Sequence, residues 1–239
     1  MLDTGNSVLA SEDSSYVWES CKSPADTILP TQVLESGGML SSRQASGNYS
    51  KGRFQLRLLP DGNLVLNTFN LETNTGYDAY YWSNTHEAGN RSNSGERVIF
   101  DELGRLYVVL QNGGSVNLKS GSAEDSSGDY YYRATLDFDG VFRIYSRHKL
   151  QSNGSWSQSW YVPKDICSEI QGDLGGGSCG FNSYCIPDSN GRPTCECLPG
   201  FSLVDTYNKL NGCKQNITQK CEPGGGSNPE DLFEKHELS

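Results

Sequence analysis

The sequence predicts a mainly β protein, a run of β-hairpin repeats followed by a small disulfide-rich module. Its 239 residues include 13 Tyr, 8 Phe and 4 Trp among 27 Gly, a mixture typical of short strands joined by tight turns. No segment has a sustained 3.6-residue apolar period, so few helices are expected. Seven of the eight cysteines lie from Cys167 to Cys221, which indicates disulfides in an oxidising compartment.

Three segments account for the repeats: residues 54–66, 97–109 and 133–145. In each, an alternating apolar strand runs into a Gly-centred turn and out into a second alternating strand. Asp61-Gly62 and Asp139-Gly140 are strong hairpin signals, because a type I′ turn needs positive φ. The turn glycines at 62, 104 and 140 are 42 and 36 residues apart, which suits an internal repeat of about 40 residues. A β-propeller has a similar period, but three repeats are too few for one.

The flanking segments are less regular. Residues 1–9 look like the last piece of an earlier unit, and a connector with two prolines follows it. Residues 35–50 are rich in Ser and Gly and are predicted to be a linker. From Cys167 to Cys213, six cysteines allow 15 pairings, so counting selects none of them. So short a segment builds little core, and its disulfides are expected to hold its fold.

Charge and export signals restrict the function. The net charge is −10, from 19 Lys plus Arg against 29 Asp plus Glu, so a nucleic-acid or anionic-membrane binder is not expected. The sequence predicts neither a transmembrane segment nor a signal peptide in this chain. Four glycosylation acceptor sites, like the cysteines, favour an extracellular or cell-surface chain that has lost its export signal: Asn48, Asn90, Asn153 and Asn216.

Several short motifs follow one another along the chain in a recognisable order. The first, Leu2-Asp-Thr-Gly-Asn6 with Val17-Trp-Glu-Ser20, resembles the end of the bulb-type lectin domain in the ectodomains of plant G-type lectin receptor-like serine/threonine kinases. Tyr80-Tyr-Trp82 and the stretch 133–143 resemble a second lectin-like unit. Cys179-Gly-Phe-Asn-Ser-Tyr-Cys185 resembles their EGF-like module, and residues 212–221 the start of their PAN domain. The resemblance covers nearly the whole chain in the family's order.

This resemblance implies a fold and its boundaries. The expected fold is a β-prism of three small antiparallel sheets around a pseudo-threefold axis. The expected divisions are a lectin remnant at 1–36, a second lectin-like prism at 44–150, an EGF-like module at 163–213, and a linker with a truncated PAN domain at 214–239. The implied disulfides are Cys167–Cys185, Cys179–Cys195 and Cys197–Cys213. Cys21 is then expected to pack in the connector, and Cys221 to pair beyond Ser239.

The resemblance also implies candidate sugar-binding residues. Bulb lectins of the family bind mannose through Gln-x-Asp-x-Asn-x-Val-x-Tyr, in which polar side chains bond the hydroxyls and Val packs on the ring. The first repeat keeps Asp61, Asn63 and Val65, the third keeps Asp139 and Tyr145, and the second keeps none. Asp-Gly-Asn is also what a hairpin turn requires. We therefore favour a turn role over a mannose site of the usual kind.

Motifs for catalysis and metal binding are weak. Residues 175–180 match a phosphate loop and a nucleophile elbow but lack the flanking strand and helix, so a flexible loop is expected. The histidines His86, His148 and His236 are scattered, and Asp165 lacks the acidic neighbours of a calcium-binding EGF module. No catalytic residue, metal or cofactor is predicted.

The sequence therefore predicts a non-catalytic extracellular recognition module of a plant lectin receptor-like kinase. Its expected partners are a carbohydrate or another extracellular ligand and, as a receptor, a homo- or hetero-oligomer. Two alternatives remain. The chain is a freestanding secreted lectin-like defence protein, or it is a fragment that would be described as a serine/threonine protein kinase only because its full-length relatives are kinases.

Overall fold

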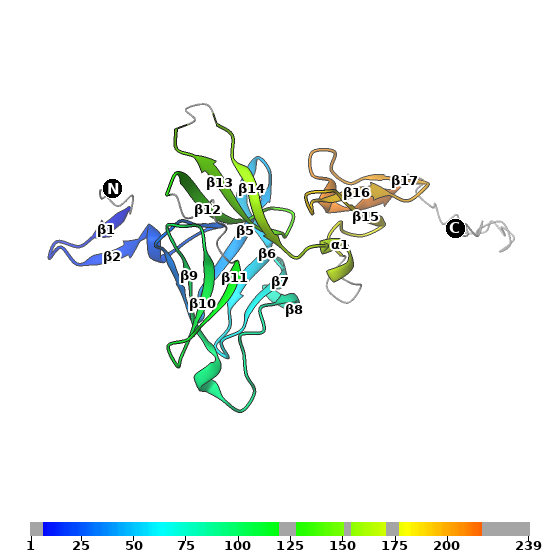
Figure 1. The fold of residues 1–239 in the computed structure, drawn as a ribbon. Helices are drawn as coiled ribbons and strands as arrows, with labels where there is room; N and C mark the ends of the chain where they lie inside the picture. The colour runs from blue at the N-terminus through cyan, green and yellow to red at the C-terminus, as the bar shows by residue number, and fades with distance from the viewer. Residues whose placement is uncertain (1–6, 120–127, 151–153, 171–176, 217–239) are drawn as a thin grey trace, which may run out of the picture.

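The computed structural model describes residues 7–119, 128–150, 154–170 and 177–216. Three four-stranded antiparallel sheets pack around one apolar core, and a separate small module of two hairpins lies beside them (Figure 1). The predicted mainly β fold, a prism followed by a disulfide-rich module, is confirmed.

Each sheet of the prism contains one of the hairpins that the sequence predicts. Sheet 1 has the order β5-β6-β7-β8, with strands Met39–Ala45, Asn48–Leu58, Leu64–Asn70 and Thr75–Trp82. Sheet 2 has the order β11-β10-β9-β4, with strands Ser115–Lys119, Leu106–Leu110, Gly95–Phe100 and Val33–Glu35. Sheet 3 has the order β14-β13-β12-β3, with strands Ser157–Val162, Phe142–His148, Tyr130–Leu136 and Thr27–Ile28.

The three hairpins present equivalent residues to the core. The same register pair recurs in each sheet, and all of its side chains are at most 1% exposed: Leu56 with Leu66, Val98 with Val108, and Ala134 with Ile144. Because side chains alternate between the two faces of a strand, the residues between these positions lie on the outer faces of the sheets. Those outer faces carry the positions of the lectin motif.

The boundaries of the prism differ from the predicted range of 44–150. Strand β3 pairs Ile28 with Ala134, and β4 pairs Leu34 with Val98, and both side chains are buried in the core. Strand β14 pairs with β13 and lies beyond residue 150. The prism thus extends from β3 to β14, because each hairpin gains a further strand on both sides. The expected separation of residues 1–36 from the prism does not fit these pairings.

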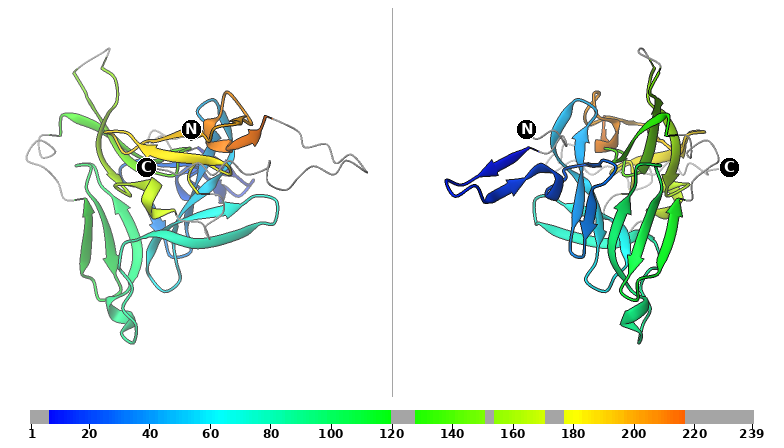
Figure 2. Two further views of the ribbon diagram at one scale, coloured as in Figure 1. Left: turned by 90° about the vertical axis from the view of Figure 1, so that its right-hand side faces the viewer. Right: turned by 60° about the vertical axis from the view of Figure 1, so that its left-hand side comes forward.

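The remainder of the N-terminal segment is a projecting hairpin. Strands β1 (Val8–Ala10) and β2 (Tyr16–Glu19) pair only with each other in the described chain and point away from the prism (Figure 2). A 3₁₀ turn, Ser20–Lys22, links them to the prism. A second 3₁₀ turn, Arg91–Asn93, lies between β8 and β9.

The small module follows β14. It contains helix α1 (Ile166–Glu169), the hairpin of β15 (Ser183–Pro187) and β16 (Pro193–Cys197), a 3₁₀ turn (Lys209–Asn211), and the hairpin of β17 (Phe201–Leu203) and β18 (Cys213–Gln215). Its disulfides confirm the implied pairing: Cys167–Cys185, Cys179–Cys195 and Cys197–Cys213. Cys21 is half-buried and takes part in none of them. Cys221 lies outside the described residues, as does the expected PAN segment from residue 217 onward.

In the described part of the chain, no helix has the length and apolar character needed to cross a membrane.

Asp165 has a local structural role, because its Oδ1 accepts the backbone N–H groups of Cys167 and Ser168 at the start of α1. Asn48, Asn90 and Asn216 are exposed, and Asn153 lies outside the described residues.

Candidate functional site

The motif positions of the first repeat lie at the β6–β7 turn and on the outer face of sheet 1. Asp61 is exposed, and its Oδ1 accepts the backbone N–H of Asn63 at 2.9 Å. The Asn63 Oδ1 accepts the Ser83 hydroxyl at 3.1 Å. Val65 lies between Arg57 and Trp82 in the register and is 3% exposed, whereas Trp82 is 50% exposed. Arg57 and the aromatic residue Trp82 therefore flank a buried valine.

Asn67 occupies the motif position of the tyrosine in the first repeat. It is buried, and its Nδ2 donates to the backbone carbonyl of Thr68 at 3.1 Å. Its Oδ1 has no hydrogen-bond partner within the described ranges. A buried acceptor without a donor is costly. The outer face of sheet 1 thus retains an acceptor that its own residues do not satisfy.

In the second repeat, the polar groups of the turn form hydrogen bonds with one another. Oδ1 of Asp101 accepts the backbone N–H groups of Leu103 and Arg105, both at 3.0 Å. Its Oδ2 accepts Nε of Arg105 at 2.6 Å. This carboxylate therefore stabilises the turn, in keeping with the absence of the motif from this repeat.

The third repeat builds a buried ion-pair network on the outer face of sheet 3. Arg143, which stands where the motif has valine, is fully buried. Its Nη1 donates to Oδ2 of Asp137 at 2.9 Å and to Oδ1 of Asp139 at 2.6 Å. The hydroxyl of Tyr145 donates to Oδ2 of Asp137 at 2.5 Å. Both predicted residues of this repeat, Asp139 and Tyr145, are thereby engaged within the protein.

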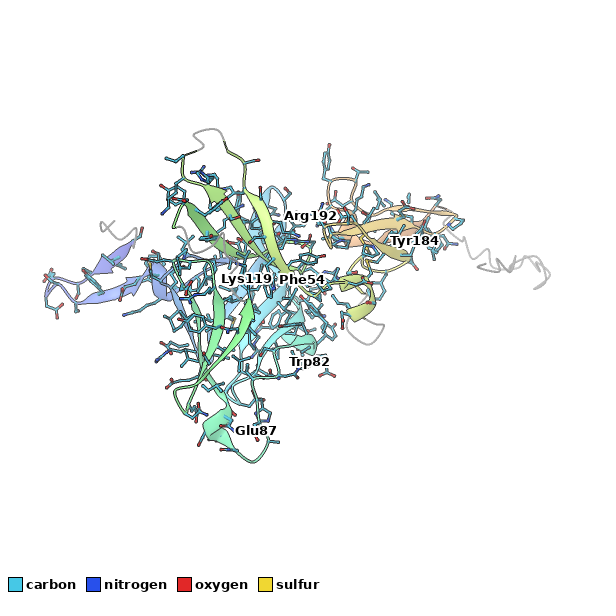
Figure 3. All side chains as sticks on the ribbon, viewed as in Figure 1. Phe54, Trp82, Glu87, Lys119, Tyr184 and Arg192 are labelled. Carbon is cyan, nitrogen blue, oxygen red and sulfur yellow. A yellow bond between two sulfur atoms is a disulfide. The ribbon has the colours of Figure 1, made fainter. Side chains whose placement is uncertain are left out.

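The disulfide-rich module completes this network through Arg192. This residue lies where the module meets the prism (Figure 3). Its Nη1 donates to Oδ2 of Asp139 at 3.0 Å, and its Nη2 donates to the Tyr145 hydroxyl at 2.9 Å. Arg43 joins the network as well, because its Nη2 lies 3.8 Å from Oδ1 of Asp137 and its Nε lies 3.6 Å from Oδ2 of Asp26. Three guanidinium groups thus face three carboxylates, which balances the formal charge of the network. Such balance is what makes burial of these charges tolerable.

Two backbone carbonyls at the tip of the β15–β16 hairpin accept hydrogen bonds from side chains of sheet 3. The carbonyl of Gly191 accepts Nη2 of Arg143 at 3.4 Å, and the carbonyl of Asn190 accepts Nε2 of Gln158 at 3.2 Å. Gly191 has φ +68°, and a Cβ there would lie 2.3 Å from the Tyr161 ring. Only glycine fits this approach without displacing the ring. The hairpin tip therefore covers the third repeat's motif positions.

Burial and charge shift two pKa values in the network. Burial, together with the hydrogen bond to Asp137, raises the pKa of Tyr145 to about 12. Burial alone lowers the pKa of Arg192, but the carboxylates of Asp139 and Asp137 outweigh it and raise this pKa above its usual value. Both shifts favour the protonated forms, in which Tyr145 and Arg192 donate hydrogen bonds.

Sequence reasoning missed the residues at the centre of this network, Asp137, Arg143 and Arg192. The first two had a signal, because residues 137, 139, 143 and 145 share the outer face of one hairpin, and two acids beside a base predict an ion pair. Arg192 had none, since it is 53 residues from Asp139 and belongs to another module.

Comparisons with known proteins find a matching family model and similar sequences. A family model described as the S-locus glycoprotein domain matches residues 105–205. The G-type lectin S-receptor-like serine/threonine-protein kinase LECRK3 of Oryza sativa subsp. indica is 42% identical over 229 residues, which cover 93% of this chain and 27% of the relative. RLK1 of Arabidopsis thaliana, which has the same description, is 35% identical over 92% of this chain and 27% of its own length.

The chain is homologous to a segment of the G-type lectin S-receptor-like kinases. The resemblance inferred from its motifs is thereby confirmed, and the chain spans about a quarter of the length of these relatives. Among solved structures, the mannose-specific bulb lectin of Scilla campanulata is 20% identical, with a TM-score of 0.36 over 54% of this chain and 97% of the lectin. The mannose-binding lectins of Gastrodia elata are 19% identical, with a TM-score of 0.35 over 59% of this chain and 97% of theirs.

Proposed function

We propose that this chain is a non-catalytic extracellular recognition segment of a plant lectin receptor-like kinase, and that it binds a carbohydrate on the outer face of sheet 1. The observation that carries the proposal is the state of that face. Asp61, Asn63 and Val65 keep their motif positions beside the half-exposed ring of Trp82. The corresponding face of sheet 3 is occupied by Arg143 and Arg192.

The chemistry of the sheet 1 face suits a saccharide. Carboxylate and amide groups exchange hydrogen bonds with sugar hydroxyls, and an aromatic ring beside a valine packs against the apolar face of a sugar. The three disulfides and the exposed acceptor residues Asn48, Asn90 and Asn216 support an extracellular location. In that setting, a second receptor chain is a further partner.

Simple mannose is not the expected ligand. Leu59 replaces the glutamine of the motif and Asn67 replaces the tyrosine, so two polar partners change. Each lost hydrogen bond costs about 0.5 to 1.5 kcal/mol, and two such losses weaken binding roughly tenfold or more. We therefore expect no saturable binding of methyl mannoside at millimolar concentration, and we expect larger plant glycans to bind by adding contacts along Trp82.

A glycan array with the refolded, disulfide-bonded chain tests this function. We expect the wild-type chain to retain a set of plant oligosaccharides, and Asn63→Ala and Trp82→Ala to lose them. Glu102→Gln, in the second turn, is the matched control and should bind as the wild type does. Retention of neutral oligosaccharides that neither sheet 1 variant alters, or no retention of any neutral saccharide, would contradict the proposal. Saturable methyl mannoside binding that Asn63→Ala abolishes would show that the reduced motif still binds mannose.

A further inference from the structure

Arg53 is a desolvated cation between the prism and the disulfide-rich module. It lies on the outer face of β6, where its Nη2 donates to the backbone carbonyl of Ser178. Its guanidinium carbon is 4.8 Å from the centre of the Phe54 ring. Within the described ranges no carboxylate forms an ion pair with it, and burial lowers its pKa to about 10. A guanidinium has five N–H donors, so much of its hydrogen-bonding capacity remains.

Arg53 lines a small cavity that adjoins a larger cleft. The cavity measures about 90 Å³, and its wall combines the guanidinium with side-chain amides and apolar groups: Gln44, Leu71, Phe138, Asn208, Leu210 and Asn211. The cleft measures about 370 Å³ and shares Phe138, Asn208 and Leu210 with the cavity. A water needs roughly 10 to 15 Å³ of such space, so the cavity has room for a carboxylate with a few waters.

Internal hydrogen bonds fix the wall of the cavity. Oδ1 of Asn208 accepts the backbone N–H of Leu210 at 3.2 Å. Its Nδ2 donates to the carbonyl of Gln44 at 3.4 Å and to Oδ1 of Asn211 at 3.2 Å. These bonds connect the module to the prism and use the donors of Asn208. Arg53 is the charged donor among the residues that line the cavity, and these bonds do not use it.

The cavity and the cleft together form a seam between the prism and the disulfide-rich module. The charge of the residues that line this seam is opposite to that of the whole chain. Its lining residues include three cations, Arg53, Arg192 and Lys209, and one carboxylate, that of Asp139. Arg192 and Asp139 both belong to the charge-balanced network of sheet 3, so the net positive charge of the seam comes from Arg53 and Lys209. In a chain of net charge −10, such a locally positive cleft favours an anionic ligand.

We propose that this seam binds an acidic saccharide, whose uronic-acid carboxylate lies against Arg53 in the cavity while the adjoining sugar rings occupy the cleft. The cleft offers the aromatic rings of Phe138 and of Tyr207, which is 98% exposed. Hydroxyl groups of Thr194 and Thr206 line it as well. Aromatic faces with hydroxyl and amide groups suit sugar rings, and the guanidinium fork matches a carboxylate. The site includes none of Asp61, Asn63, Val65 and Trp82, the residues proposed to bind a carbohydrate on sheet 1, and does not depend on them.

Calorimetric titration of the refolded chain with trigalacturonic acid at low salt tests this site. We expect saturable binding that weakens at least tenfold in Arg53→Gln, because the variant removes a charge-assisted hydrogen bond. Asn63→Ala is the matched control on sheet 1 and should bind as the wild type does. The methyl ester of trigalacturonic acid, which lacks the charges, should not bind. Added salt should weaken binding of the acid.

Thermal unfolding separates ligand binding from a structural role of Arg53. A partly buried cation without a carboxylate partner is costly, so Arg53→Gln should unfold at the same temperature as the wild type or higher. Tyr207→Ala alters only the exposed rim and should also weaken binding, which provides a test if Arg53→Gln does not fold. Unchanged affinity in both variants would overturn the proposal. Equal binding of the methyl ester, or of a hexaglutamate peptide, would overturn it too, because a uronic acid would not be what the site selects.

Discussion

The first and third hairpin turns of the prism share one backbone device and differ in what surrounds it. Asp61 and Asp139 each accept the backbone N–H two residues later, at 2.9 and 3.2 Å. Four residues after each aspartate the chain has Val65 in the first repeat and Arg143 in the third. Asp61 is exposed, whereas Asp139 is 3% exposed and faces two guanidinium groups.

This difference teaches that one turn motif can serve two roles. The aspartate forms the hairpin in both repeats, and its outer-face neighbours decide whether its remaining oxygen meets solvent or another part of the chain. In the third repeat, Arg143 and Arg192 use the polar groups that a sugar would need. We infer that the third repeat attaches the disulfide-rich module, and that the first remains available to a ligand.

The largest expected difference between the turns is in stability. Asp139→Ala removes a partner from the fully buried Arg143 and from Arg192, and breaking a buried pair costs about 3 to 5 kcal/mol. Asp61→Ala removes one exposed turn hydrogen bond and should cost about 1 kcal/mol or less. Chemical denaturation with the disulfides intact measures both free energies of unfolding. Equal losses in the two variants would contradict the proposed distinction.

A smaller loss is expected from the module side of the network. Arg192→Met removes donors to Asp139 and Tyr145, but the Arg192 side chain is 38% exposed. We discount the loss for solvent screening to about 1 to 2 kcal/mol. Hydrogen exchange should become faster at the β15–β16 turn, since its contact with sheet 3 weakens. Arg105→Met, which breaks the ion pair within the second turn, is the control and should leave exchange at that turn unchanged.

Alkaline pH should weaken the third repeat further. The pKa of the Tyr145 phenol is raised from 10 to about 12 in the folded protein, chiefly by burial. A phenol with a raised pKa stabilises the fold fully below about pH 10, and this contribution is lost as the pH rises toward 12. Tyr145→Phe should therefore lose less stability over this interval than the wild type does. Tyr207→Phe, at an exposed position, should follow the wild type, and identical curves for all three proteins would contradict the assignment.

The hairpins of the prism could be predicted from the sequence because their signals are local. Alternating apolar residues around each turn place Leu56 opposite Leu66 and Ala134 opposite Ile144. The outer strands could not be predicted in the same way. Strand β3 has two residues and β4 has three, too few for alternation to be recognised. Only their pairing across the fold reveals that Ile28 and Leu34 complete the core.

The candidate site was predictable in part. The motif identified Asp61, Asn63, Val65, Asp139 and Tyr145, but alignment on a motif does not report what approaches from outside. The approach of Arg192 depends on how the disulfide-rich module sits against sheet 3, which is a long-range contact without a sequence period. The disulfide pairing could be inferred from family resemblance alone, because six cysteines leave 15 pairings open by count.

A double-mutant cycle between Asp139 and Arg192 tests the central claim most directly. The claim is that a motif carboxylate of the third repeat holds the disulfide-rich module through this arginine, and the two side chains lie 3.0 Å apart in the structure. The free energies of unfolding of Asp139→Asn, Arg192→Met and the double variant give the coupling energy. Direct contact predicts a favourable coupling of about 0.5 to 3 kcal/mol, whereas losses that add to within about 0.3 kcal/mol would contradict the claim.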